Sequence, residues 1–404
     1  MHHLSQEHSK SSHWIATWTA STQPLWGEEL PFPNNMAALS GQQTVALRLR
    51  VSLGGKRLRL LFSNEYGTQP LILGPVSVAL GSNTQKHQTL LFSAQPQAVI
   101  AAGKTLLSDP LELDIPDLAS LFVRFYLPQR CPVSSFHWDT RRTVTLLPGN
   151  QTLVEHVDSC TGTEITALPV LGAAWVETST NRSVVAVIGD SLVDGNGVSI
   201  DSDQRWTDHL AKHLVPHGVA VVNAGQSGSR LRQNGIGISA KIRFERDVLN
   251  VPGIRLGILQ VGLNDLGWPG TPLEPDTAPP SAAVLITAYQ DLIAQAHAKH
   301  IPLVGLTLTP FKGAFGGSPF DAFFTPEKEA IRQALNTWMR SSQEFDALID
   351  LDTLLRDPQD PQRLRATLDV GDHLHPHNHG NQLIAESISI KTLLSLLQRS
   401  EITA

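Results

Sequence analysis

The sequence predicts an α/β protein in which a parallel sheet covered by helices follows an all-β domain of the sandwich or jelly-roll type. Up to about residue 165, apolar and polar residues alternate with a period of two, and Gly, Pro, Asn and Asp separate the candidate strands. After Asn181 the pattern changes to strand, helix, strand, helix, which is typical of a parallel sheet. These patterns divide the 404-residue chain into an expected strand-rich domain at residues 14–170 and an expected α/β domain at residues 181–404.

The first half contains several short strand candidates. Residues 45–51 alternate apolar and polar side chains, and residues 58–62 do the same after Gly54 and Gly55. We expect these two segments to pair as a hairpin. Residues 76–80 and 121–127 are further strand candidates. Several short strands punctuated by turn residues are typical of a sandwich or jelly roll.

The second half alternates apolar strands with helical patterns. The strands are expected at residues 184–188, 219–222, 256–261, 303–308 and 347–351. One helix is indicated by Trp206, Leu210 and Leu214 at four-residue spacing, and Gly218 would close it. Another is expected to begin at residues 325–327, where Thr, Pro and Glu supply an N-cap, a first-turn proline and an acidic first turn.

The composition is that of an ordinary globular protein. Hydrophobic residues make up 41% and charged residues 17% of the chain, and the formal net charge is −6. No Lys- or Arg-rich stripe is present, so we expect no nucleic-acid partner. With only Cys131 and Cys160, a disulfide framework and a Cys-rich zinc site are excluded, whereas a single bridge stays open.

The first ten residues bear on localisation. They are polar and lack the apolar core of a signal peptide, and no later apolar run is long enough to span a bilayer. We therefore expect no membrane span. The sequence as given predicts a cytoplasmic protein, or a secreted or periplasmic one from which an export signal has been removed.

The most informative segment is the β-branched run at residues 184–188, which ends in a small-residue turn that carries Ser191. Open α/β sheets place their chemistry at the carboxyl edge of the strands, and glycines allow a tight turn there. Ser191 is therefore the candidate nucleophile. The alternative is that Ser191 only caps the following helix.

Two further segments follow the next strands and fall on the same edge. Gly228 lies in the turn at residues 223–230, and Asn264 lies in the run Gly262–Asp265. Acyl transfer needs hydrogen-bond donors for a tetrahedral oxyanion, and a glycine N–H and an asparagine amide are suitable groups. The alternatives are a simple glycine turn and an Asx-type cap.

The segment before the last helices offers a base. Asp372 precedes His375 by three residues, a spacing at which an aspartate on a turn can hold the imidazole Nδ1–H and leave Nε2 free to take a serine proton. Four histidines alternate in this segment: His373, His375, His377 and His379. Zinc binding is the competing interpretation, but Pro376 interrupts a regular strand. We expect one catalytic histidine, three polar loop histidines, and no metal or cofactor.

In chain order, these segments resemble the four sequence blocks of the SGNH or GDSL hydrolase superfamily, over about residues 181–397. The matching residues are Gly189-Asp190-Ser191-Leu192, then Gly228, then Gly262-Leu263-Asn264-Asp265, then Asp372-His373-Leu374-His375. The first half, with residues 14–18 and 61–67, resembles the β-rich domain that precedes such catalytic domains in some bacterial two-domain members. The usual elbow G-x-S-x-G of α/β-hydrolases is absent, because position 193 is valine.

The resemblance implies a three-layer α/β/α, flavodoxin-like catalytic domain and a serine esterase without a cofactor. It implies Ser191 as nucleophile, His375 as general base and Asp372 as its orienting partner. The implied oxyanion donors are the Gly228 N–H, the Asn264 side chain and the Ser191 N–H. Asp190 and Asp194 are then either supports of the turn or solvated loop acids.

Three functions stay open on the sequence alone. The first is hydrolysis of short-chain acyl or acetyl esters, including O-acetylated carbohydrate, as small-molecule or carbohydrate substrates. The second is a lysophospholipase or thioesterase with the same triad, and the third a non-catalytic carbohydrate-binding protein. The loop at residues 311–317 either lines the site or is a plain surface loop, and Trp26 and Trp138 either stack on sugars or belong to the core. Acyl length, leaving group and oligomeric state are not readable from the sequence.

Overall fold

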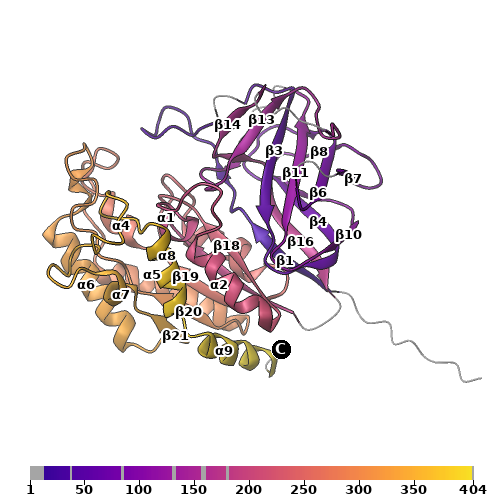
Figure 1. Ribbon diagram of the computed structural model, residues 1–404. Helices are drawn as coiled ribbons and strands as arrows, with labels where there is room; N and C mark the ends of the chain where they lie inside the picture. The colour runs from indigo at the N-terminus through magenta and orange to yellow at the C-terminus, as the bar shows by residue number, and fades with distance from the viewer. Residues whose placement is uncertain are drawn as a thin grey trace, which may run out of the picture.

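A computed structural model describes residues 13–36, 39–82, 86–129, 133–155, 161–178 and 182–402. Cys131 and Cys160, for which a single bridge stays open, lie outside these described residues. Figure 1 shows a strand-rich part, formed by the first half of the chain, packed against an α/β part formed by the second half. None of the helices in the described segments is both long and apolar enough to cross a membrane.

The strand-rich part is antiparallel throughout its described pairs. One sheet contains, in spatial order, β1 (His13–Thr19), β16 (Leu171–Thr178), β4 (Gly55–Asn64) and β10 (Leu111–Ile115), with β9 (Lys104–Leu107) also paired to β4. The other contains β14 (Thr163–Ile165), β13 (Val144–Pro148), β3 (Gln43–Arg50), β11 (Ser120–Leu127), β6 (Val76–Leu80) and β7 (Gln88–Leu90). Two smaller sheets are β15 (Leu168–Pro169), β12 (Ser135–His137) and β2 (Gln23–Pro24), and β5 (Leu71–Leu73) with β8 (Ala98–Ile100).

The two larger sheets pack face to face as a sandwich. Every second residue of β3 and of β4 is buried, which is the pattern of strands with one face toward the core. The rings of Phe62 on β4 and Phe125 on β11 meet across the sheets, with their centroids 5.5 Å apart. The predicted sandwich is therefore confirmed.

The predicted hairpin at residues 45–62 is wrong. β3 pairs with β11 and β13, whereas β4 pairs with β16, β10 and β9 in the opposite sheet. The chain changes sheets directly after β3: the Val51 N–H donates to the Ala119 carbonyl beside β11, and the Ser52 N–H donates to the Thr17 carbonyl on β1. Alternation thus predicts which face of a strand is buried, but not which strand is its neighbour.

The α/β part is built on a parallel sheet, as predicted. Its spatial order is β18 (Val219–Gly225), β17 (Ser183–Gly189), β19 (Ile254–Gln260), β20 (Leu303–Leu306) and β21 (Ala347–Ile349). This is the flavodoxin-like order 2-1-3-4-5, in which the chain reverses direction across the sheet at the first strand. Gly189 at the end of β17 pairs with Gly225 and Gln260, so three strands end together at this reversal point.

Helices cover both faces of this sheet, giving three layers. The face formed by Val185 and Val187 packs on α2 (Trp206–Leu214), α7 (Leu351–Leu355), α8 (Asn378–Ser387) and α9 (Ile390–Ile402). The face formed by Val184, Ala186 and Ile188 packs on α3 (Ala240–Phe244), the π-helical segment η3 (Glu245–Leu249), α5 (Ala282–Ala298) and α6 (Pro326–Ser341). Shorter helices are α1 (Ser191–Asp194), η2 (Val215–His217), α4 (Leu263–Gly267) and η4 (Asp321–Phe323). Because β17 is buried on both sides, it reads as a continuous apolar run.

The predicted helix ends are confirmed. α2 runs into η2, which ends at Gly218 in the left-handed region with φ 73°. At the start of α6, the Thr325 hydroxyl accepts a hydrogen bond from the Lys328 N–H, and Pro326 occupies the first turn.

The two parts share one hydrophobic cluster. Ile15 of β1 packs against the Gly253 turn and Val184, and the Ala16 N–H donates to the Pro252 carbonyl. β16 extends the strand-rich part to Thr178, where it pairs with β1. The division into domains at residues 14–170 and 181–404 stays a prediction, and the shared core means that neither part is an isolated unit.

Candidate active site

Ser191 sits in the first turn after β17. Asp190 is the N-cap of α1, and its carboxylate accepts the Leu192 N–H at 3.1 Å. Ser191 is therefore the first residue of the helix and not its cap, so the capping interpretation of Ser191 is wrong. α1 lies directly on the end of β18, since a Cβ on Gly225 would fall 2.2 Å from the Asp194 nitrogen. This contact fixes the height of Ser191 above the sheet edge.

The structure brings Ser191, His375 and Asp372 together in one line of hydrogen bonds. His375 Nε2 lies 2.8 Å from Ser191 Oγ, and His375 Nδ1 lies 2.6 Å from Asp372 Oδ2. Ser191 is 8% exposed and His375 7% exposed, so little of either residue is accessible to solvent. A hydroxyl, an imidazole and a carboxylate in this order are the parts of a charge-stabilised nucleophile.

Asp372 is held in place by the backbone. Its Oδ1 accepts the N–H groups of Leu374 at 2.9 Å and of His375 at 2.8 Å. Burial raises the pKa of Asp372, but the hydrogen bond and charge of His375 outweigh it and hold that pKa below its usual value. An ionised carboxylate requires a proton on His375 Nδ1. A neutral imidazole with its proton on Nδ1 presents an unprotonated Nε2 to the Ser191 hydroxyl.

Gly228 and Asn264 lie at the same edge. Gly228 has φ 77°, a conformation that favours glycine, and Asn264 lies on α4 and is 5% exposed. The Asn264 amide donates to the Ser229 carbonyl at 3.0 Å, which leaves it a second N–H. The backbone N–H groups of Ser191 and Gly228 meet no acceptor among the described residues. The Ser191 and Gly228 N–H groups and the second Asn264 N–H are thus available to bind an oxyanion.

Asp190 and Asp194 are 1% exposed each, so the solvated-loop interpretation is wrong and both support the turn. Asp194 accepts from the N–H and hydroxyl of Ser227, at 3.0 and 2.6 Å. Burial raises the pKa of Asp190 to about 7 and that of Asp265 to about 6. The carboxyl groups of Asp190 and Asp265, beside Ser191 and Asn264, are therefore poorly hydrated.

The histidines of the segment before α8 have different roles. His373 is hydrogen-bonded to Asp369, with Nδ1 2.6 Å from Oδ2. His377 is the N-cap of α8, and its Nε2 lies 2.9 Å from the Thr367 carbonyl. Across the described ranges, no three His, Cys, Asp or Glu side chains gather as a metal site would require.

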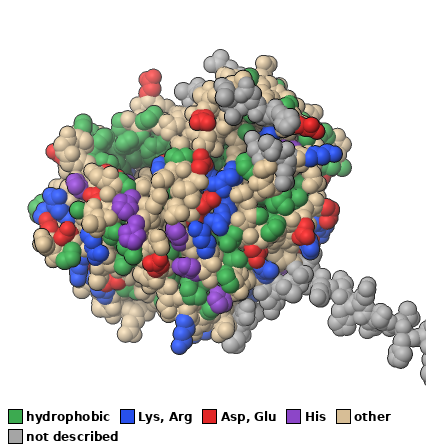
Figure 2. All heavy atoms as spheres, in the orientation of Figure 1, with side chains coloured by type: hydrophobic (Ala, Val, Ile, Leu, Met, Phe, Trp, Pro, Cys, Tyr) green, Lys and Arg blue, Asp and Glu red, His purple; other side chains and the backbone are tan. Residues whose placement is uncertain are grey.

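Aromatic residues of both parts meet near this edge. Phe32 of the strand-rich part contacts Trp268 and Phe320, with ring centroids 5.9 and 5.6 Å apart, and Trp268 stacks on Phe315 at 5.8 Å. Trp268 directly follows α4, the helix of Asn264. On the face seen in Figure 2, hydrophobic side chains gather around a hollow at the upper left.

The structure gives different outcomes for Trp26, Trp138 and the loop at residues 311–317. Trp26 is 6% exposed and packs on Phe136, so it belongs to the core. Trp138 is partly exposed, and its ring contacts Trp26 at 5.0 Å. In the loop at residues 311–317, Phe311 and Ala314 are buried, while the Phe315 ring joins the aromatic cluster. This loop is therefore packed against the site's surroundings and is not a free surface loop.

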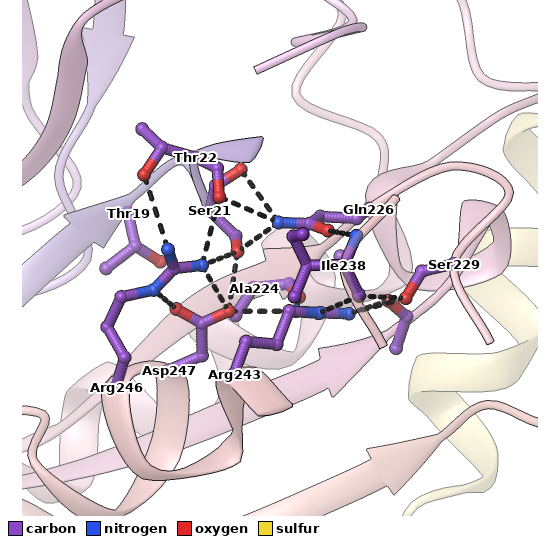
Figure 3. Close-up of polar contacts among 12 residues, drawn as sticks. Thr19, Ser21, Thr22, Ala224, Gln226, Ser229, Ile238, Arg243, Arg246 and Asp247 are labelled. Carbon is purple, nitrogen blue, oxygen red and sulfur yellow. Dashed lines mark hydrogen bonds and ion pairs between the residues drawn. The ribbon is translucent and has the colours of Figure 1, made fainter. Parts of the chain in front are cut away.

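Sequence patterns missed a polar network that joins the two parts behind the site (Figure 3). Arg243, 2% exposed, donates to the carbonyls of Gly189, Ala224 and Ile238 and to Asp247. It thereby holds the ends of β17 and β18 together. No local pattern could have indicated this role, because its partners are spread along the chain.

The Lipase_GDSL_2 model of the GDSL-like Lipase/Acylhydrolase family matches residues 187–383. Among the curated proteins, no relative matches the chain. Similar solved structures include a GDSL-like lipase from Bacteroides thetaiotaomicron, with 17% identity, TM-score 0.39, and 54% of this chain and 91% of that one covered. The native aryl esterase of M. smegmatis has 15% identity and TM-score 0.42, with 53% and 100% covered.

A third similar structure is a mutant of an acetyl-xylooligosaccharide esterase from Geobacillus Stearmophilus, with 18% identity, TM-score 0.34, and 51% and 91% covered. The family match spans β17 to α8 and includes the segments of Ser191, Gly228, Asn264 and His375. The α/β part therefore contains a GDSL-like lipase/acylhydrolase domain at residues 187–383.

Proposed function

We propose that the protein is a serine esterase that hydrolyses carboxylic esters through an acyl-enzyme on Ser191. The observation that carries this proposal is the continuous line of hydrogen bonds from Asp372 through His375 to Ser191. Acyl transfer also requires stabilisation of an oxyanion. The available N–H groups of Ser191, Gly228 and Asn264 on the same edge support this step.

In the proposed reaction, His375 Nε2 takes the Ser191 proton while Oγ attacks the ester carbonyl carbon. The carbonyl oxygen becomes an oxyanion that accepts hydrogen bonds from the three donors. His375 then protonates the leaving alcohol as the C–O bond breaks, which leaves an acyl-enzyme. Water attacks the acyl-enzyme with His375 again as base, and the acid is released. Asp372 orients the imidazole and stabilises its cation without taking its proton.

For the substrate, we propose short-chain acyl or acetyl esters, including O-acetylated carbohydrate. The low exposure of Ser191 and His375 supports a small acyl group. The partly exposed rings of Phe32 and Phe315 support a leaving group with a flat face, such as a sugar or aryl ring. A lipid-directed function with the same triad is the alternative outcome of the test.

A chain-length series of p-nitrophenyl esters, from acetate to palmitate, tests both levels of the proposal. We expect kcat/KM to be highest for acetate to butyrate and to vanish in Ser191→Ala. A preference for long chains would replace the short-chain substrate by a lipid one. Hydrolysis that is equal in the wild type and Ser191→Ala would remove Ser191 from the reaction.

A further inference from the structure

His137 belongs to β12 in the strand-rich part, yet its ring touches the helix that carries Ser191. His137 Nε2 lies 3.0 Å from Asp194 Oδ1, and His137 Nδ1 lies 3.0 Å from the Ser21 carbonyl oxygen. The histidine is 4% exposed and Asp194 1%. The contact therefore joins the two parts of the molecule in a nearly water-free environment.

The geometry defines the protonation of this pair. The Ser21 carbonyl can only accept a hydrogen bond, so His137 Nδ1 must carry a proton. Nε2 faces the Asp194 carboxylate and, at 3.3 Å, the Asp139 carbonyl, so it also donates. Burial lowers the pKa of His137, but Asp194 outweighs burial and the nearby charge of Arg205 and raises that pKa above its usual value. The pair is an imidazolium and a carboxylate.

Asp194 connects this cation to both halves of the site. It is the last residue of α1, three positions after Ser191, and its second oxygen accepts from the N–H and hydroxyl of Ser227. Ser227 immediately precedes Gly228. One carboxylate thus fixes the distance between the nucleophile helix and the loop that carries a proposed oxyanion donor.

The other side of His137 leads to the same loop. Figure 3 shows Ser21 and Thr22 facing Gln226, whose Nε2 donates to Ser21 Oγ at 2.8 Å and to the Thr22 carbonyl at 3.0 Å. Gln226 Oε1 accepts the Ile238 N–H at 3.0 Å. The strand-rich part therefore holds this loop through two routes, directly at Gln226 and through the carboxylate at Ser227.

We propose that His137 is a positioning residue for the esterase site, through which the strand-rich part sets the spacing between Ser191 and the oxyanion donor of Gly228. This inference rests on the proposed function. Without the imidazolium, the buried Asp194 carboxylate keeps only the charge of Arg205, without a hydrogen-bonded cation. This is unfavourable, and we expect α1 and the loop to shift so that the carboxylate is hydrated. A shift of about 1 Å in reacting groups lowers turnover by about 10²-fold.

The test compares His137→Ala, His137→Gln and a matched control, Arg48→Gln. Arg48 also joins the two parts through an ion pair, 2.9 Å from Asp203, but it bonds neither α1 nor residues 226–229 among the described contacts. We expect His137→Ala to lower kcat for p-nitrophenyl acetate about 30- to 100-fold with KM changed less than about threefold. His137→Gln, which keeps one donor, should recover part of kcat, and Arg48→Gln should keep it.

Asp194→Asn and the double variant with His137→Gln complete a double-mutant cycle. We expect the two effects on kcat to be strongly non-additive, because both remove the same contact. Unfolding temperatures are measured beside the kinetics, and His137→Gln carries the test if His137→Ala does not fold. Variants that lose stability while kcat stays within about twofold of wild type would overturn the positioning role. Failure of the esterase proposal is seen separately, as wild-type hydrolysis that survives Ser191→Ala.

Discussion

Asp369 with His373 and Asp372 with His375 are two aspartate–histidine pairs in the same loop, and both have Nδ1 2.6 Å from a carboxylate oxygen. They differ in the second ring nitrogen. His375 Nε2 meets the Ser191 hydroxyl in a buried site, whereas the His373 side chain is 44% exposed and lies beside the turn at Gly313. An Asp–His pair is therefore not by itself a mark of catalysis. The partner of the free nitrogen and its burial distinguish the two.

Substitution of the two histidines should give the largest difference in activity between the two pairs. We expect His375→Ala to lower kcat/KM for p-nitrophenyl acetate by about 10⁴-fold or more, because His375 is the base that contacts the Ser191 hydroxyl among the residues that the structure describes. His373→Ala, as the control, should stay within about twofold, as most exposed substitutions do. Equal losses in the two variants would abolish the distinction between the pairs.

The aspartates come next. Asp372→Asn should lower kcat about 10³- to 10⁴-fold, because an amide cannot stabilise the imidazolium and favours the wrong tautomer. Asp369→Asn keeps the oxygen that accepts the Gly371 and His373 N–H groups, so its kcat should be nearly that of wild type. Steady-state kinetics of the two variants decide the point, and a reversed order would assign the orienting role to Asp369.

Asn264 belongs to the site but to neither pair. Its substitution should therefore lower kcat by an amount between those for the two pairs. Asn264→Ala should lower kcat about 10²- to 10³-fold with little change in KM, as loss of one oxyanion donor does. The measurement uses the same acetate ester, with circular dichroism as a check that the bond to the Ser229 carbonyl is not needed for folding. A loss no larger than that of His373→Ala would exclude Asn264 from the oxyanion site.

Two acids of the site, Asp190 at the cap of α1 and Asp372 beside His375, should have opposite effects on stability. Asp190, with its pKa raised to about 7, binds more protons in the folded state, so its contribution to stability falls as pH rises from about 4 to 7. Asp190→Asn, which can keep the cap, should therefore gain stability over wild type across that range. The pKa of Asp372 is lowered, so Asp372→Asn should cost stability at neutral pH and lose this cost as pH falls below about 4.

Thermal unfolding at pH 3, 4, 5.5 and 7 measures both differences. Parallel curves for Asp190→Asn and wild type would show that the folded and unfolded states hold the Asp190 proton equally.

Much of the α/β part and of the site could be predicted because the signals are local. A strand buried on both faces reads as the run at residues 184–188, and Ser191, Asp372 and His375 follow from short segments next to predicted elements. The three-residue spacing of Asp372 and His375 defines their pairing directly. Local patterns also placed the cap at Thr325 and the end at Gly218.

The rest depends on contacts between distant segments. The hairpin expected at residues 45–62 failed because alternation is the same whichever sheet a strand joins. His137 and Arg243 were missed because a single histidine or arginine carries no pattern, and the partners of His137 are 57 and 116 positions away. A helix cap was the alternative interpretation of Ser191, but the cap is its neighbour Asp190, and sequence cannot separate the two because both residue types are good caps.

The hydrophobic cluster that runs from Ile15 to Val184 and beyond has a thermodynamic consequence. Neither sheet can lose its packing without exposing apolar surface of the other, so partial unfolding of one half gains little chain entropy at a large hydration cost. We expect heat to melt the protein in a single calorimetric transition, with loss of esterase activity and of the strand-rich sandwich at the same temperature. Melting would then be cooperative over the whole described chain.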